Sequence, residues 1–513
     1  MDKKVRVRFA PSPTGFMHVG NFRSALYDYL FAKKNGGDFV LRIEDTDQKR
    51  FVPGALESLI NVLDWAGLRY DEGVFQSAGI KNDKIPTTES KNYPGILEAG
   101  EFEPYIQSEK LEIYKKYADQ LVKSGHAYYC FCEPERLEKM RADQTVEKKA
   151  PMYDRYCLHN VSEEEINKNL KNSCSYTIRM KMPEGEMIEA DDLVRGKVSF
   201  KTDLIDDQIL MKSDGFPTYH LANVIDDHEM GITHVIRGEE WLPSLPKHIL
   251  LYRYFDWELP KFAHLPLLLN PDKTKLSKRQ GDVAVEDYIK KGYLKEAIIN
   301  FVALLGWNPG AGETQEIFSL DELVQRFELE KVHKAGAVFD LKKLDWINAE
   351  YIKKLSIDEL YEKALPFFEQ KEFFIQAGAE KKSPEFLKRV LTVEFDRLPK
   401  LSDVGENNQF FFATDLNYDK SLLRWKEMTD EYLKKNLEKV QELLGNISED
   451  EWSRENLEAK LLAVAGEKRG ELLWPLRAAL TGTQKSPSPF EVAWVLGKTE
   501  SLRRIEKAVS LVV

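Results

Sequence analysis

The hydrophobic positions of the first 50 residues change from a period of two to a period near four. Residues 5–9 alternate between apolar side chains and arginine, which predicts a strand, while residues 22–30 carry apolar side chains at helical spacing. Asn21 is the predicted N-cap of this helix, and the Asn-Gly-Gly run at 35–37 predicts its end. Residues 38–47, DFVLRIEDTD, predict a second strand. This β-α-β order predicts a parallel, doubly wound sheet.

The segments after residue 47 also mix predicted helices and strands, and the C-terminal third is predicted to be helical. Residues 79–103 are rich in Pro, Gly and polar side chains, which predicts a surface insertion. Residues 108–122 have a helical pattern, and strand-like runs follow at 175–182 and 233–237. Beyond Tyr351 the pattern is almost wholly helical. We therefore expect an α/β fold with a Rossmann-like parallel sheet and an inserted α+β module, followed by an all-helical C-terminal region.

Composition narrows the class of protein. With 513 residues, of which 42% are hydrophobic, the chain is long enough for about three or four domains with cores of their own. No apolar run approaches the roughly 18 residues of a membrane span, and the charged N-terminus lacks the apolar stretch of a secretory signal. We expect a cytoplasmic protein. Its formal net charge of -11 means that any nucleic acid must be bound by local basic patches.

The turn between the first strand and the first helix has the composition of a phosphate site. Residues 8–26 read RFAPSPTGFMHVGNFRSAL. A strand, a tight turn and a helix start bring backbone N–H groups and the positive end of the helix dipole to one point. Gly15 and Gly20 allow the backbone to approach a ligand, and His18 is able to donate to a phosphate oxygen. Taken alone, an H-x-G turn of this kind favours a His18 that only caps or packs.

A second segment favours the interpretation of the turn as a phosphate site. Residues 270–283 read NPDKTKLSKRQGDV, a polar loop in which Lys275 and Lys278 flank Ser277. Such a loop is most often a solvated surface. The two segments in this order, however, match the HIGH-type motif (here HVGN) and the KMSKS-type motif (here KLSKR) of class I aminoacyl-tRNA synthetases. The ordered pair is far more specific than either segment.

Further segments identify the family that the chain resembles. PSPTG, GGDFVLRIEDTD, DGFPTYHLANVIDDHEMGITHVIRGEEW, AVFDLKKLDWIN and PLRAALTG all resemble bacterial glutamyl-tRNA synthetases, and the resemblance covers nearly the full length. It implies an enzyme that activates L-glutamate with ATP to glutamyl-adenylate. The enzyme then transfers glutamate to the 3′ end of tRNA(Glu) and releases AMP and pyrophosphate. Mg²⁺ would accompany the ATP.

The resemblance also implies a domain order and a monomer. The expected regions are the first half of the Rossmann catalytic domain (1–107), an inserted acceptor-end module (108–211), the second half of the catalytic domain (212–270), a stem-contact region with the basic loop (271–350), and a helical anticodon-binding region of two subdomains (351–513).

Site residues follow from the same resemblance, position by position. The implied catalytic residues are His18, Lys275 and Lys278. The implied ATP-binding residues are Gly15, His18, Gly20, Lys275, Ser277 and Lys278. The implied glutamate-binding residues are Arg8, Ala10, Ser12, Glu44, Tyr219, Asn223 and Arg237. Arginines suit the two carboxylates of glutamate, and Glu44 suits its ammonium group. Taken singly, Arg8 and Glu44 are also compatible with surface ion pairs.

Three cysteines and a histidine form a candidate metal site. Cys130, Cys132, Cys157 and His159 stand in the order C-x-C, 24 residues, C-x-H. Four such ligands suit tetrahedral Zn²⁺, although the one-residue gaps are tighter than usual. Reduced cysteines in a packed strand pair are the alternative. The arrangement resembles the zinc-binding acceptor-end module of some glutamyl-tRNA synthetases, which favours a structural zinc.

Two other functions stay open on the sequence alone. A glutaminyl-type synthetase shares the front half, but the resemblance then leads us to expect a β-barrel anticodon module in place of helices. A non-catalytic tRNA-binding protein derived from a synthetase is the second alternative, and the retained His18, Lys275, Lys278, Arg8 and Arg237 disfavour it. Whether tRNA(Gln) is also charged is not decided by these residues.

Overall fold

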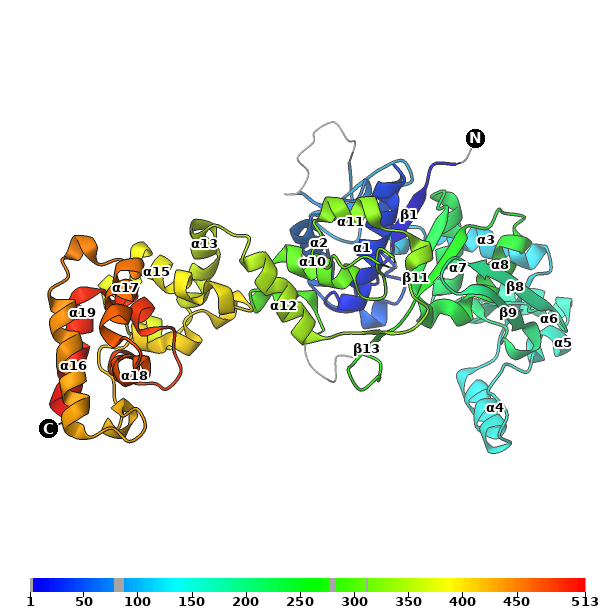
Figure 1. The fold of residues 1–513 in the computed structure, drawn as a ribbon. Coiled ribbons are helices and arrows are strands. Elements are labelled where there is room, and N and C mark those ends of the chain that lie inside the picture. Colours follow the sequence, from blue (N-terminus) through cyan, green and yellow to red (C-terminus); the bar gives the residue numbers. More distant parts are fainter. Residues whose placement is uncertain (1–2, 78–86, 277–282, 311, 513) are drawn as a thin grey trace. The chain divides into compact units, whose positions relative to one another are not determined.

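The chain folds into two compact units in the computed structural model, which describes residues 3–77, 87–276, 283–310 and 312–512. Unit 1 comprises Met1–Tyr288 and Ile298–Leu341, and unit 2 comprises Ile289–Ala297 and Lys342–Val513. Unit 1 mixes helices and strands, whereas unit 2 is helical (Figure 1). This confirms the predicted fold class. The finer division at 107, 211, 270 and 350 stays a prediction.

A parallel sheet forms the centre of unit 1. Strands β1 (Arg6–Phe9), β2 (Asp38–Leu41) and β3 (Glu72–Gln76) are parallel neighbours. On the other side of β1, the N–H of Thr233 donates to the carbonyl of Arg6 at 2.9 Å, which brings β11 (His234–Gly238) and its parallel neighbour β12 (Lys261–Leu265) alongside. The carboxyl ends of parallel strands meet at one edge, where doubly wound folds bind their ligands.

Helices connect these strands. Helix α1 (Val19–Lys34) joins β1 to β2, α7 (Tyr219–Glu229) precedes β11, and α8 (Leu245–Tyr254) joins β11 to β12 (Figure 1). The other helices of unit 1 are α2 (Ala55–Ala66), α3 (Leu111–Lys123), α4 (Pro134–Val146), α5 (Tyr156–Asn160), α6 (Glu163–Lys171) and α11 (Leu320–Arg326), while α9 (Val285–Lys290) and α10 (Lys295–Ala303) belong partly to unit 1 and partly to unit 2. Further strands are β4 (Thr88–Glu89), β5 (Ile96–Ala99), β6 (Ala127–Cys130), β7 (Thr177–Met180), β8 (Met187–Asp192), β9 (Gly196–Lys201), β10 (Ile209–Met211), β13 (Leu268–Leu269) and β14 (Ala337–Val338).

The arginines of β1 are buried, although their alternation with valine is typical of a half-exposed strand. Arg6 makes two bonds of 2.7 Å to the carboxylate of Glu72. Arg8 donates from Nε to Asp227 at 3.0 Å. Burial of a charge is tolerated only where a partner and hydrogen bonds compensate it, and both arginines have such partners. The core of unit 1 therefore contains ion pairs at the centre of its sheet.

Two local predictions are wrong. Helix α1 begins at Val19 with His18 as its N-cap, because the imidazole Nδ1 accepts the backbone N–H of Gly20 at 2.9 Å, so Asn21 is not the cap. Residues 87–103 are not only surface loop, because β5 pairs antiparallel with β3 and is largely buried. Residues 78–86 lie outside the described part. The strands in this segment are short and lie between Pro and Gly residues, so their hydrophobic periodicity is too brief to predict them from the sequence.

Unit 2 is a set of helices around a small apolar core. Its helices are α12 (Leu341–Ile352, all but its first residue), α13 (Ile357–Phe368), α14 (Glu372–Ile375), α15 (Pro384–Glu394), α16 (Asp430–Gly445), α17 (Arg454–Ala465), α18 (Arg469–Thr481) and α19 (Pro489–Leu511). Leu433 and Leu437 of α16 pack in one cluster with Ala478 of α18 and Ala508 of α19. The described residues of unit 2 include no strand.

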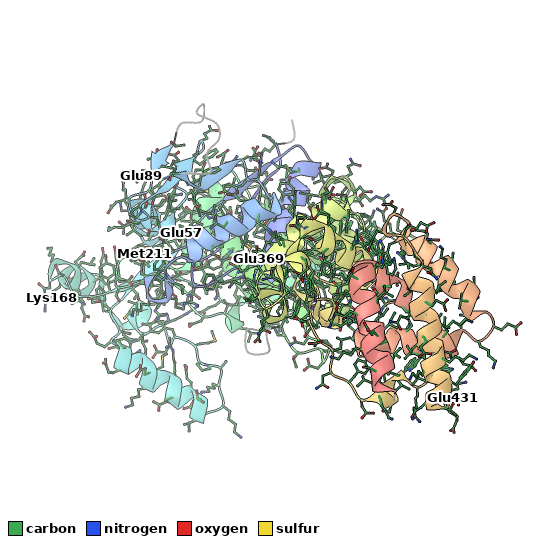
Figure 2. The ribbon with its side chains drawn as sticks, turned by 90° about the vertical axis from the view of Figure 1, so that its left-hand side faces the viewer. Glu57, Glu89, Lys168, Met211, Glu369 and Glu431 are labelled. Carbon is green, nitrogen blue, oxygen red and sulfur yellow. The ribbon has the colours of Figure 1, made fainter. Side chains whose placement is uncertain are left out.

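Polar side chains cover the outer surfaces of both units. Figure 2 shows Lys168 of α6 and Glu431 of α16 among the exposed ones. Within the described residues, no helix combines the length and the apolar character that crossing a bilayer would require.

Candidate active site

A cavity of about 800 Å³ opens at the carboxyl ends of β1, β2 and β11. Its lining contains the following residues predicted from the sequence: Arg8, Ala10, Ser12, His18, Gly20, Glu44, Tyr219, Asn223, Arg237 and Lys275. Gly15 is not among the lining residues, and Ser277 and Lys278 lie outside the described residues. Segments that are more than 200 residues apart in sequence thus contribute to one cavity.

The His18 turn forms the N-terminus of α1 at this cavity. Because Nδ1 of His18 accepts the N–H of Gly20, a neutral imidazole carries its proton on Nε2. A Cβ at position 20 would lie 3.1 Å from Nδ1, so glycine keeps this contact uncrowded. The turn therefore combines a ring donor with the positive end of a 16-residue helix.

The residues on both sides of the KLSKR segment have backbone pairing partners, and one side is bonded to the His18 turn. Lys275 lines the cavity and pairs through its backbone with Leu269. On the other flank, the N–H of Val19 donates to the carbonyl of Val283 at 2.8 Å, and that of Val285 donates to Met17 at 2.9 Å. The backbone thus joins the C-terminal flank of the second motif to the first, while the N-terminal flank is paired with Leu269 of β13.

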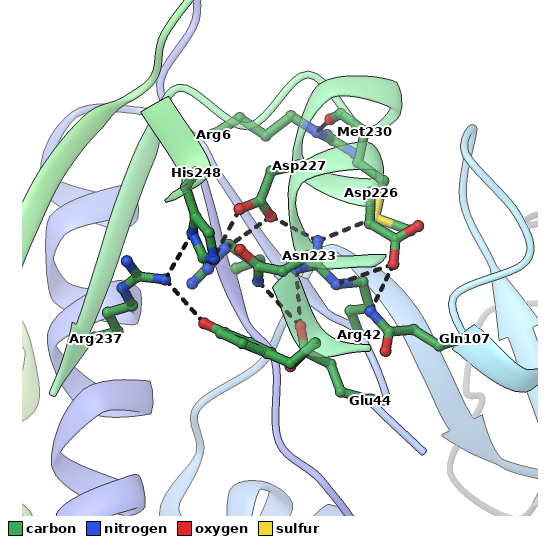
Figure 3. Close-up of polar contacts among 12 residues, drawn as sticks. Arg6, Arg42, Glu44, Gln107, Asn223, Asp226, Asp227, Met230, Arg237 and His248 are labelled. Atoms are coloured by element: carbon green, nitrogen blue, oxygen red, sulfur yellow. Dashed lines mark hydrogen bonds and ion pairs between the residues drawn. The ribbon is translucent and has the colours of Figure 1, made fainter. Parts of the chain in front are cut away.

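A buried network of ions forms one wall of the cavity (Figure 3). Arg8 and Arg42 both donate to Asp227, at 3.0 and 2.7 Å, and Arg42 also donates to Glu44 at 3.1 Å. The amide of Asn223 donates to the same oxygen of Glu44 at 3.1 Å. Arg8 is therefore neither a surface residue nor paired with Glu44, contrary to the simplest reading of an isolated Arg and Glu.

This network affects the two carboxylates differently. Burial opposes the ionisation of Asp227, but the guanidinium groups of Arg8 and Arg42 outweigh it and hold the pKa of Asp227 below its usual range. Burial raises the pKa of Glu44, although Arg42 and Arg8 oppose the rise. Glu44 is thus the carboxylate of this wall that gains most from a cation in the cavity.

Arg237 approaches the cavity from the carboxyl end of β11. Its Nε donates to Nε2 of His264 at 3.0 Å, and its NH1 nitrogen contacts the hydroxyl of Tyr219 at 2.8 Å and Nδ1 of His248 at 3.2 Å (Figure 3). Its NH2 nitrogen is buried and has no hydrogen-bond partner among the described residues. A buried guanidinium nitrogen at a cavity wall suits a carboxylate ligand.

Sequence reasoning missed several groups of this site. Asp227 had a detectable signal, because it follows Asn223 by four residues and so shares its helix face. Asp28 had none. It lines the cavity with both carboxylate oxygens buried and unpartnered among the described residues, and burial raises its pKa well above the usual range. His248 and His264 come from other elements and had no signal either.

The candidate metal site contains three of its four predicted ligands. One Sγ each from Cys130, Cys132 and Cys157 lies within 4.8 Å of the others. The hydroxyl of Tyr153 lies 3.4 Å from Sγ of Cys130 and 3.2 Å from Sγ of Cys132. His159 is exposed and is not part of this group. The structure thus presents a tyrosine oxygen where the spacing predicts a histidine.

Comparison with known proteins gives consistent matches along the whole chain. The family model "tRNA synthetases class I (E and Q), catalytic domain" matches residues 4–346, and "Anticodon binding domain" matches residues 359–509. A glutamate–tRNA ligase of Prosthecochloris aestuarii is 46% identical, with 99% of this chain and 98% of the relative covered. A glutamate–tRNA ligase of Alkaliphilus metalliredigens is 44% identical, with 98% of both covered.

Solved structures agree with these matches. The crystal structure of a glutamate tRNA ligase from Elizabethkingia meningosepticum, in complex with its amino acid, has a TM-score of 0.85 at 37% identity and covers 100% of both chains. A glutamate–tRNA synthetase from Elizabethkingia anophelis has a TM-score of 0.83 at 37% identity, with 99% of this chain and 100% of that chain covered.

Proposed function

Because this chain belongs to the class I tRNA synthetases and, among them, to the glutamate–tRNA ligases, we propose how its cavity performs their reaction. The reaction joins L-glutamate to tRNA(Glu) at the expense of ATP. In the first step a carboxylate oxygen of glutamate attacks the α-phosphorus of ATP, and pyrophosphate leaves. In the second step a terminal ribose hydroxyl of the tRNA attacks the adenylate carbonyl, and AMP leaves.

One observation carries the assignment of roles. Residues from both motif segments and from the glutamate-binding set line the same cavity, which is large enough for a nucleotide and an amino acid side by side. Neither the fold nor any single residue would support the function alone. The convergence of Arg8, His18, Arg237 and Lys275 supports it.

The phosphate side consists of the His18 turn and the basic segment. Nε2–H of His18 and the N-terminus of α1 would hold the phosphates of ATP. Lys275, together with Lys278 from the undescribed segment, would balance the charge that moves toward pyrophosphate as the P–O bond breaks. Fixed donors and cations of this kind stabilise such a transition state by several kcal/mol. Mg²⁺ would enter with ATP and would supply positive charge that offsets the charge of its phosphates.

The amino-acid side consists of opposite charges. The NH2 nitrogen of Arg237 would bind a carboxylate of glutamate, and Arg8 would add positive charge from the floor of the cavity. Glu44 would accept the ammonium group, while Tyr219 and Asn223 would fix its position. Ala10 and Ser12 would form the wall beside it. Glutamine would leave a cation without its anion, and a polar site rejects such a ligand strongly.

The tRNA would contact both units. Residues 359–509 match an anticodon binding domain, so we assign anticodon reading to unit 2 and the acceptor end to the 108–211 module. We retain the prediction that the enzyme acts as a monomer. The helical unit 2 disfavours a glutaminyl-type enzyme with a β-barrel module, and the predicted residues that line the cavity disfavour a non-catalytic protein.

The purified full-length chain is expected to form glutamyl-tRNA from L-glutamate, ATP and tRNA(Glu), with glutamine and aspartate as poor substrates. Charging of purified tRNA(Glu) and tRNA(Gln) in separate reactions measures this and shows which tRNA is used. Exchange of labelled pyrophosphate into ATP is run with tRNA present, since activation in this family is expected to require it. Absence of glutamate attachment to either tRNA would refute the assignment.

A structural zinc in the 108–211 module is the second part of the proposal. Cysteine sulfur is the preferred donor for tetrahedral Zn²⁺, and the three sulfurs already lie within one coordination sphere of each other. The hydroxyl of Tyr153 is the nearest fourth donor, at 3.2 Å from Cys132. It therefore fits better than the exposed His159. The ion would cross-link β6 to the segment that carries Cys157.

Zinc analysis tests this part. The wild-type chain is expected to bind one Zn²⁺, and Cys130→Ser to bind none, because serine supplies no soft donor. His159→Ala is the matched control and should keep its metal, whereas Tyr153→Phe should bind it more weakly. Elemental analysis of dialysed protein gives the stoichiometry. If His159→Ala lost its zinc and Tyr153→Phe kept it, the fourth ligand would be His159. If the wild-type chain bound no zinc, the proposed metal site would be refuted.

A further inference from the structure

Arg237 is held by the protein on two of its three nitrogens. Nε donates to His264 at 3.0 Å, and the two hydrogens of NH1 are directed at His248, at 3.2 Å, and at the hydroxyl of Tyr219, at 2.8 Å. A guanidinium has five N–H donors, so three of them are used by the protein. Only the two hydrogens of the buried NH2 nitrogen lack a partner among the described residues. The three hydrogen bonds to Nε and NH1 fix the plane of the guanidinium, and they therefore determine where the two NH2 hydrogens point.

A guanidinium donates only, so both rings must present a lone pair to it. His264 then carries its proton on Nδ1, which lies 2.6 Å from Oδ2 of Asp192. His248 carries its proton on Nε2, which lies 3.2 Å from Nδ1 of His220. The order Asp192, His264, Arg237, His248, His220 thus forms one chain of hydrogen bonds in which each ring has a single permitted tautomer.

The charges around these rings keep them neutral. Burial, the Arg237 charge and the neighbouring His220 hold the pKa of His248 well below its usual range. Burial also lowers the pKa of His264, although Asp192 opposes this, and burial lowers that of His220 to about 3. Both rings beside Arg237 therefore stay acceptors at neutral pH.

Asp192, the last residue of β8, is fixed by backbone groups. Its Oδ1 accepts the N–H groups of Val194 at 3.0 Å and Arg195 at 2.8 Å, while Oδ2 accepts Nδ1 of His264. Both oxygens also lie within 3.2 Å of the backbone N of His264. Asp192 is buried and does not line the cavity. Any effect that it has on the substrate must pass through the ring of His264.

We propose that Asp192 is a positioning residue for glutamate recognition, which acts through the tautomer of His264 to aim the two remaining donors of Arg237 at a substrate carboxylate. The inference rests on the proposed function, in which Arg237 binds glutamate. It adds a requirement that lies outside the cavity. The substrate carboxylate is recognised only while Asp192 keeps the proton of His264 on Nδ1.

Asp192→Asn tests this with little change in shape. The backbone N–H groups of Val194 and Arg195 hold the amide oxygen at the Oδ1 position, so the new NH2 group faces Nδ1 of His264. The ring must then accept there, and its proton moves to Nε2, where it faces the Nε–H of Arg237. We expect the KM for glutamate to rise about 30-fold, with the roughly 10–100-fold cost of losing the partner that orients a metal-binding histidine as the guide. The KM for ATP should stay unchanged.

Three comparisons separate this from a merely structural effect. Asp191→Asn, the same change at the exposed neighbouring position, should behave as wild type. In His264→Gln the side-chain oxygen replaces the Nε2 acceptor without needing Asp192, so adding Asp192→Asn to it should change the KM for glutamate less than threefold. The ¹⁵N shifts of His264, assigned by comparison with His264→Gln, should show the proton on Nδ1 in wild type and on Nε2 in Asp192→Asn.

The outcomes are distinct. A wild type without glutamate attachment would refute the proposed function and not this inference alone. With an active wild type, an unchanged KM for glutamate in Asp192→Asn, or a raised KM without the tautomer change, would overturn the inference. If Asp192→Asn does not fold, His264→Gln and His264→Leu decide instead. Glutamine should keep the KM within a few-fold and leucine should raise it strongly, and equal values would overturn the inference.

Discussion

Arg237→Ala is expected to lower kcat/KM for glutamate about 10³-fold, which corresponds to roughly 4 kcal/mol of transition-state stabilisation. The variant loses the cation of a cavity-lining residue whose buried NH2 group has no partner among the described residues, and it leaves the acceptors of His248 and His264 unpaired in a buried place. Truncating one partner of a buried, hydrogen-bonded charge typically costs 2–5 kcal/mol or more. Steady-state charging of tRNA(Glu) at varied glutamate concentration measures the loss.

Two variants define what this loss means. Arg237→Lys keeps the charge but replaces the planar fork with a single ammonium, so we expect an intermediate loss of about 10²-fold. Arg253→Ala removes an exposed arginine of the nearby helix α8 and should leave kcat/KM unchanged. If Arg237→Ala retained kcat/KM within threefold of wild type, the carboxylate would have to be bound elsewhere in the cavity.

His18→Asn is expected to lower the rate of adenylate formation by about 10²-fold without weakening tRNA binding. Asparagine places its oxygen near the Nδ1 position, so it can keep the N-cap bond to Gly20, but it has no donor where Nε2–H stands. Removing one fixed donor to the reacting phosphates costs about 10²–10³ in rate. Pyrophosphate exchange in the presence of tRNA gives the rate, and filter binding gives the tRNA affinity.

His18→Ala is the matched comparison. It loses both the donor and the cap, so it should show the same catalytic loss and an added loss of helix stability of about 1 kcal/mol. Thermal unfolding separates the two effects. If His18→Asn were as active as wild type while His18→Ala were inactive, the imidazole would act as a cap only, and the phosphate role would be withdrawn.

The sequence allowed the fold to be predicted wherever periodicity was strong. The β1-α1-β2 unit and the helices beyond Tyr351 carry clear periods, and both are confirmed. The N-cap was mispredicted because histidine is not among the usual capping residues. The alternation in β1 also gave no sign that Arg6 and Arg8 are buried, since burial there depends on Glu72 and Asp227, which are distant in sequence.

The cavity was predicted mainly through the family resemblance. Position-by-position matching selected Arg8, Glu44 and Arg237, although each alone is compatible with an ordinary surface ion pair. It could not supply the groups that hold these residues in place. Asp192 and His264 are 72 residues apart in sequence, and neither belongs to a local pattern. Contacts of this kind arise from the packing of the sheet and become visible only in the folded chain.

The attachment between Met17–Val19 and Val283–Val285 is made by peptide groups rather than by side chains. Mutational drift at 283–285 can therefore exchange one apolar side chain for another of similar size while the backbone joint between the two motifs persists. Proline at position 285 is the exception, because it would remove the N–H that Met17 accepts. The joint between the two motifs thus tolerates apolar exchanges at 283 and 285, where both side chains are buried, but not proline at 285.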